Sequence, residues 1–181
     1  LKAGGTALKF IRVGLVAYML VGIIELITSF RVMAIQTQFT HLATALEQLG
    51  LYGGISMLFF GAIYYMVPRL TGSPWASAGL TNGHRVVVIL GVLLSVLALA
   101  FAGYTQGAAL MDAKNSFAGI FEQVRGALLV NTAAQIMLIG ANLLLLVNFA
   151  RTACCCCCRP KDVAPATNLF RQPSTLEAHA S

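Results

Sequence analysis

The sequence predicts an all-α protein that crosses a membrane as a four-helix bundle. Hydrophobic residues make up 58% of its 181 residues and charged residues only 10%, against roughly 45–50% and 25% in an average soluble protein. So little charge cannot cover the surface of a water-soluble domain of this length. Four apolar stretches are each near or above the ~20 residues that a helix needs to cross a bilayer. They lie at about residues 13–30, 45–67, 86–111 and 126–150.

The second span is the one around which the other helices are expected to pack. Residues 49–67 carry no charge, and about 19 residues at 1.5 Å per residue cover roughly 28 Å. Gly50 and Gly54 form a GxxxG pair, and Gly61 follows. Small residues at this spacing let two helix backbones approach closely, so these glycines are predicted to form a packing face. The loop after this span contains Trp75, which suits the aromatic belt of a membrane interface.

The first span contains one carboxylate, Glu25. An acidic side chain inside a membrane helix costs roughly 2.5–3.5 kcal/mol on insertion scales, so it must face protein or water or be protonated. One interpretation is a proton or cation relay. The other is a glutamate near the end of its helix that reaches the interface or a polar group on a neighbouring helix.

The fourth span carries one polar stripe, formed by Asn131, Gln135 and Asn142. At 100° per residue these side chains fall on one side of the helix. Such amides commonly form hydrogen bonds between membrane helices. The alternative is that they line a polar channel. The third span, residues 86–111, is free of charge and long enough to tilt.

The positive charges predict the orientation of the chain. With four spans, residues 1–12, the loop after the second span and the tail at residues 151–181 share one side of the membrane. The positive-inside rule makes the side richer in Lys and Arg cytoplasmic, so both termini are expected in the cytoplasm and the tail is expected to be disordered or to lie on a partner. That side holds Lys2, Lys9, Arg12, Arg69, Arg85, Arg151, Arg159, Lys161 and Arg171, and the other holds Arg31, Lys114 and Arg125.

All five cysteines are consecutive, from Cys154 to Cys158. Adjacent residues cannot all point at one tetrahedral metal, which argues against a zinc site. Juxtamembrane cysteines can be acylated. The run is otherwise interpreted as a small, apolar extension of the last helix in a reducing compartment.

Two motifs lie at the end of the second span and inside the third. Residues 60–70 read FGAIYYMVPRL, and residues 103–107 read GYTQG. They resemble F-G-x-x-Y-x-x-x-P-R-L and G-x-T-Q-G in the catalytic subunit (subunit I) of cbb3-type haem–copper cytochrome c oxidases. The likeness covers about residues 8–150 and implies a haem–copper oxidase subunit I-like fragment that corresponds to the C-terminal four helices of that subunit.

The haem ligands of that family are not matched. In the family the second of these helices begins H-x-H-S-G, and its histidines ligate two haems. Counted back from Pro68, those positions fall on Leu46 and Gln48. Neither side chain is a normal haem ligand. The remaining candidates, His41 and His84, are expected at opposite membrane faces, as ordinary interfacial histidines or at most a single-histidine haem site.

The resemblance therefore implies a non-catalytic membrane subunit of a respiratory electron-transfer complex, a cytochrome oxidase or an oxidase-containing supercomplex. Its role would be assembly, with lipid or quinone packing in a helix cleft. No catalytic residue and no metal site is predicted, and haem is expected in cytochrome-bearing partner subunits rather than in this chain. The compartment implied is the bacterial cytoplasmic (inner) membrane, and nucleic acid is not an expected partner.

Two alternatives remain. The chain could be a fragment of a split cbb3-like oxidase core, in which Glu25 and the polar stripe line a proton path. It could also be a small homo-oligomeric transporter or channel, although Glu25 is almost the only charge inside its spans.

Overall fold

The structure is a computed structural model that describes residues 2–157; the side chains of residues 2–4, 32, 36 and 155–157 are not described. Helices dominate this part of the chain, as the all-α prediction requires. In chain order they are α1 (Lys2–Thr28), α2 (Arg31–Thr37), α3 (His41–Gln48), the π-helix η1 (Leu49–Ser56), α4 (Met57–Thr71), α5 (Ala78–Leu110) and α6 (Phe117–Cys157).

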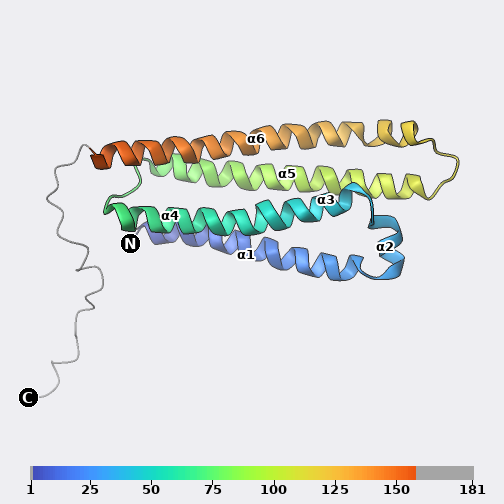
Figure 1. The fold of residues 1–181 in the computed structure, drawn as a ribbon, viewed down its shortest axis with the longest axis horizontal. Coiled ribbons are helices and arrows are strands. Elements are labelled where there is room, and N and C mark those ends of the chain that lie inside the picture. Colours follow the sequence, from blue (N-terminus) through green and yellow to red (C-terminus); the bar gives the residue numbers. More distant parts are fainter. Residues whose placement is uncertain (1, 158–181) are drawn as a thin grey trace, which may run out of the picture.

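These elements form an elongated bundle of four rods (Figure 1). The rod α3–η1–α4 is continuous from His41 to Thr71, and α1 packs along η1 and α4, while α5 packs against α6 and α3. Each rod contains a stretch long and apolar enough to cross a membrane: Gly5–Thr28, His41–Thr71, Ala78–Leu110 and Phe117–Cys154. The predicted four-helix membrane bundle is confirmed.

The helices are longer than the apolar runs from which the spans were predicted. Polar residues extend them because a helical backbone satisfies its own hydrogen bonds outside the hydrocarbon as well as inside it. α1 already begins at Lys2, within the predicted N-terminal segment, and α6 continues to Cys157, within the predicted tail. The remainder of that tail, with Cys158, lies outside the described residues.

Side-chain hydrogen bonds fix the loop between α4 and α5. Ser77 caps α5 by accepting from the backbone N–H of Leu80. Asn148 of α6 holds the same turn from the other side, since its amide accepts from the Ser77 N–H and donates to the Ser77 carbonyl, both at 3.2 Å. The Thr81 hydroxyl accepts a further bond from Asn148 at 2.9 Å. The loop between α4 and α5 is therefore tied to α6.

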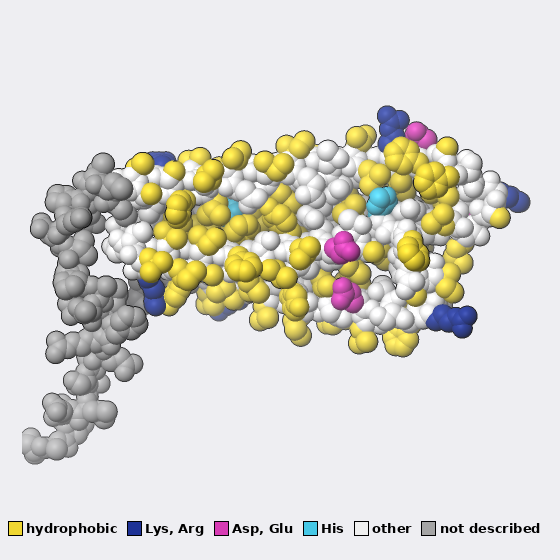
Figure 2. Space-filling model, in the orientation of Figure 1, with side chains coloured by type: hydrophobic (Ala, Val, Ile, Leu, Met, Phe, Trp, Pro, Cys, Tyr) yellow, Lys and Arg dark blue, Asp and Glu magenta, His cyan; other side chains and the backbone are white. Residues whose placement is uncertain are grey.

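The outer surface is apolar along most of its length. Figure 2 shows hydrophobic side chains over the length of the rods and most Lys and Arg side chains toward the two ends. Large apolar side chains such as Leu26, Leu97 and Ile136 are about two-thirds exposed. Such a surface suits lipid or another membrane helix, and it supports the membrane assignment.

Candidate functional site at the π-helix and the groove beside it

The second rod departs from α-helical geometry at its centre. Between α3 and α4, residues Leu49–Ser56 form the π-helix η1. π-helices are rare, and they occur frequently at functional sites. This one includes Gly50 and Gly54 of the predicted packing face, and it begins directly after Gln48, one of the two positions that correspond to the family's haem-ligating histidines.

The glycine face packs against α1. A Cβ on Gly14 of α1 would lie 2.9 Å from the carbonyl oxygen of Gly54, and a Cβ on Gly61 would lie 2.7 Å from a side-chain carbon of Ile11. Both distances are too short for real carbon contacts, so only glycine permits this approach. Gly50 is looser, since its added Cβ would lie 3.7 Å from Val21. The face is thus occupied within the chain, by α1.

The two ligand positions of the resemblance lie at the end of α3. Leu46 is half-buried and borders two surface hollows. The side-chain nitrogen of Gln48 is buried and has no hydrogen-bond partner among the described residues. A buried amide N–H without a partner is unfavourable by about 1–3 kcal/mol. The Gln48 amide nitrogen therefore adds no hydrogen bond to the described fold.

Glu25 lies on the outer surface and not beside the polar stripe. It lines a hollow of about 270 Å³ together with Glu47, which precedes η1. It also lines a second hollow with residues of α2 and α3. Neither hollow includes a residue of α6, so the structure does not bring Glu25 together with Asn131, Gln135 or Asn142.

The polar stripe of α6 faces inward and forms hydrogen bonds with two other rods. Ser95 of α5 donates to the Asn131 side-chain oxygen at 2.7 Å, and the Gln135 amide donates to Ser95 at 3.1 Å. Asn142 donates to the hydroxyl of Tyr52 in η1. The amides are therefore engaged with neighbouring helices rather than exposed to a channel or to a partner.

His84 is buried inside the bundle, whereas the sequence suggested an ordinary histidine at the membrane interface. It is the seventh residue of α5, its side chain points into the bundle, and it is 0% exposed. The Tyr64 hydroxyl lies 3.1 Å from its Nδ1, and the Phe10 and Phe60 ring centres lie 5.6 and 4.8 Å from its ring centre. Nε2 is buried without a partner among the described residues.

His41 lies at the opposite end of the bundle, at the start of α3 (Figure 1). Its backbone N–H donates to the side-chain oxygen of Gln106 at 3.0 Å, which caps α3. Gly103 completes this contact, since a Cβ there would overlap the backbone of Leu42. Gly103 and Gln106 of the GYTQG motif thus position the start of α3, and the two histidines are not brought together.

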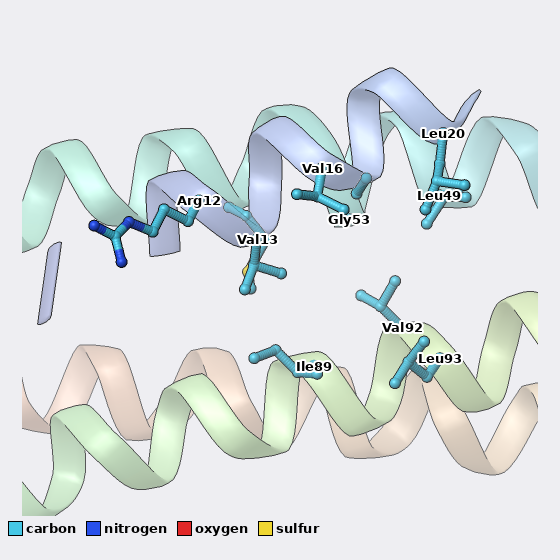
Figure 3. Close-up of a pocket in the computed structure, with 11 residues that line it drawn as sticks. Arg12, Val13, Val16, Leu20, Leu49, Gly53, Ile89, Val92 and Leu93 are labelled. Carbon is cyan, nitrogen blue, oxygen red and sulfur yellow. The ribbon is translucent and has the colours of Figure 1, made fainter. Parts of the chain in front are cut away.

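An apolar groove runs between α1 and α5 over the floor made by η1 and α4. Its volume is about 330 Å³, and Arg12 is its single charged lining residue. Figure 3 shows the side chain of Val92 pointing across the groove toward α1, Ile89 lying along α5, and the Arg12 guanidinium at one end. The apolar lining residues are Val13, Val16, Ala17, Leu20, Leu49, Gly53, Met57, Ile89, Val92 and Leu93.

The groove was not predicted from the sequence, although the sequence contains a signal for one of its walls. Arg12, Val16 and Leu20 are spaced four residues apart, so they lie along one side of α1. An arginine directly before a predicted span, with apolar residues four and eight positions later on the same face, indicates an apolar stripe with a charged end. This pattern does not predict the opposite wall of the groove, which is formed by residues of α5.

The family comparison agrees with this architecture. The profile described as Cytochrome C and Quinol oxidase polypeptide I matches residues 3–152 of the chain, which includes all four rods. The chain belongs to this family. No curated protein matches it in a direct sequence comparison. As a polypeptide I relative, it is a multi-pass membrane protein related to the subunit I of haem–copper oxidases.

Haem and copper are the groups that the polypeptide I family implies, and the described residues do not fit them. No cluster of three or more His, Cys, Asp or Glu side chains suited to a metal occurs among the side chains that the structure describes. His84 is enclosed by Phe10, Phe60 and Tyr64, which leave no open face for a porphyrin. His41 stands alone at the far end.

Proposed function

We propose that this polypeptide I relative is a non-catalytic membrane subunit of a respiratory electron-transfer complex, a cytochrome oxidase or an oxidase-containing supercomplex. The observation that carries the proposal is the pair Leu46 and Gln48 at the positions that correspond to the family's haem ligands. Because α3 lacks imidazoles at both positions, it cannot supply the axial ligands, whatever other helices stand beside it.

The finer assignment to the cbb3 type is part of the proposal. It is supported by the motifs at residues 60–70 and 103–107, whose glycines make close helix contacts at Gly61 and Gly103. We further propose the bacterial inner membrane, with both termini in the cytoplasm, because most Lys and Arg residues lie on that side of the four spans.

We propose the hollow that contains Glu25 and Glu47 as the contact with a partner subunit. Both carboxylates belong to membrane-spanning segments and both are exposed on the outer surface. A carboxylate facing lipid is unfavourable by roughly 2.5–3.5 kcal/mol, and a donor or cation on an adjacent helix removes much of that penalty. Expected partners are therefore membrane subunits that present Arg, Lys or amide side chains here.

Co-purification tests this role. The chain, tagged at its C-terminus, is isolated from its native membrane in a mild detergent, and co-migrating proteins are identified by mass spectrometry. Cytochrome-bearing subunits should co-purify with it. The variant Glu25→Lys, alone and with Glu47→Lys, should lower their recovery severalfold, while Glu122→Lys, at an exposed position near the start of α6, should not. A chain that emerges alone from wild-type membranes contradicts the proposal.

The location of the haem distinguishes the proposed subunit from the alternative, a fragment of a split oxidase core. A fragment of a divided cbb3-like core that takes part in electron transfer would keep haem after its partners are removed. A scaffold subunit would lose it with them. Substitution of His41 or His84 would abolish the haem signal only in the first case.

A further inference from the structure

We propose that the groove between α1 and α5 binds one acyl chain of an anionic glycerophospholipid whose phosphate is held by Arg12. This inference deepens the lipid-packing part of the proposed function by naming the site and the headgroup chemistry. Its test uses the isolated chain, so it can fail while association with an oxidase stands, and the reverse.

The size of the groove selects a linear chain. The groove has a volume of about 330 Å³. A membrane helix with its side chains is about 10–12 Å across and does not fit such a space. From Arg12 to Leu20 the wall formed by α1 rises about 12 Å, which gives the groove the length of a partial acyl chain. Both ends of that wall are lining residues.

The lining of the groove excludes a headgroup inside it. Apart from Arg12 the lining side chains are aliphatic, a glycine and one methionine. A quinone ring would bring two carbonyl oxygens into this lining, and at most one of them could reach the arginine. A hydrocarbon chain needs no hydrogen bond, and it restores the contacts that an empty apolar groove lacks.

Arg12 supplies the complementary charge. Its side chain is exposed at one end of the groove (Figure 3) and forms no salt bridge within residues 2–157. Lys9, one turn earlier on α1 and also exposed, adds a second cation. A guanidinium donates two parallel hydrogen bonds to phosphate oxygens. The long side chain also allows the charged end to reach the headgroup region from a position inside the span.

Titration with defined lipids tests the site. The full chain is delipidated in detergent, and binding of phosphatidylglycerol and phosphatidylcholine with identical acyl chains is followed by native mass spectrometry. Wild type should bind one phosphatidylglycerol about tenfold more tightly than phosphatidylcholine. Arg12→Gln should remove that preference. Arg151→Gln, an exposed arginine of α6, serves as the matched control and should keep it.

The acyl chain is tested by filling the groove. Val16→Phe should weaken binding of both lipids severalfold, and Leu93→Phe should do the same from the opposite wall. Leu15→Phe is the control, because Leu15 is exposed on α1 but does not line the groove. Circular dichroism checks that each variant keeps its helices. Val16→Phe and Leu93→Phe change opposite walls of the groove, so each tests the site independently.

Three results would overturn the proposal. The first is equal binding of the two lipids by wild type, and the second is an unchanged preference in Arg12→Gln. The third concerns the occupant in native membranes, where a photoreactive residue at position 16 should cross-link to lipid. A cross-link to a polypeptide instead would identify the groove as a seat for a partner.

Discussion

Trp75 donates its indole N–H to the backbone carbonyl oxygen of Tyr64 at 3.1 Å. In an unbroken α-helix that carbonyl accepts from the residue four positions later. Here this residue is Pro68, which has no N–H to donate. The loop after α4 therefore returns a donor to the carbonyl that the proline leaves without one, and it explains why the helix continues past Pro68 to Thr71.

This relationship predicts a coupling between Trp75 and Pro68. Trp75→Phe should lower the free energy of unfolding by about 1–3 kcal/mol, since it leaves a half-buried carbonyl unpaired. In a Pro68→Ala background the alanine N–H can bond to the same carbonyl, so Trp75→Phe should then cost markedly less. Equilibrium unfolding in mixed micelles measures all four proteins. Equal losses in both backgrounds would show that the indole acts only by packing.

The contact between Tyr64 and His84 gives a second prediction. Tyr64→Phe keeps the ring but removes the hydroxyl that lies 3.1 Å from Nδ1 of His84. Nδ1 then joins Nε2 in having no partner among the described residues. We expect a loss of about 1–3 kcal/mol in the free energy of unfolding. Tyr65→Phe is the control, because Tyr65 is 40% exposed. A similar small effect of both substitutions would contradict the buried pair.

Gly103 gives a third prediction, on helix approach. Gly103→Ala should displace α3 from α5 and destabilise the protein, because the new Cβ would overlap the backbone of Leu42. Gly140→Ala is the matched substitution, since a Cβ there meets nothing within 4 Å. It should be neutral or stabilising by up to about 1 kcal/mol, because alanine favours the helix. Thermal unfolding of the two variants measures their stabilities. A Gly103→Ala variant more stable than the Gly140→Ala variant would contradict the close contact at Gly103.

The hydrogen-bond network of the polar stripe gives a fourth prediction. Ser95→Ala removes the hydroxyl that joins Asn131 and Gln135. Hydrogen bonds between membrane helices are worth about 0.6 kcal/mol on average and up to ~1.7, so a loss in that range is expected. Thr132→Ala should have a smaller effect, because Thr132 is exposed and bonds only to its own helix. If the stripe lined a channel instead, Ser95→Ala would leave stability unchanged.

The four rods could be predicted from sequence because the bilayer imposes a minimum length on each apolar run. The side of α6 that carries Asn131, Gln135 and Asn142 could also be read from spacing alone. The hydrogen-bond partners of that side could not, since Ser95 and Tyr52 belong to helices whose rotation depends on the whole packing.

Other parts of the site depend on tertiary contacts that no local pattern records. His84 stands near the start of an apolar run, which suggested the interface, but Phe10 of α1 and Phe60 of α4 enclose it. Trp75 fitted an aromatic belt, and its role at Tyr64 follows only from the fold of the loop. The π-helix η1 depends on a shift in the backbone hydrogen bonds. Its glycines allow this shift, but their presence in the sequence does not predict it.

The central claim is that this polypeptide I relative provides no haem ligand, and a haem spectrum of the separated chain tests it most directly. The complex is purified through the chain, its subunits are dissociated in stronger detergent, and the haem content of each fraction is measured as the pyridine haemochrome. We predict that haem stays with other subunits and that the tagged chain, still helical by circular dichroism, carries none. Stoichiometric haem on the separated chain, lost in His84→Leu or His41→Leu, would contradict the account.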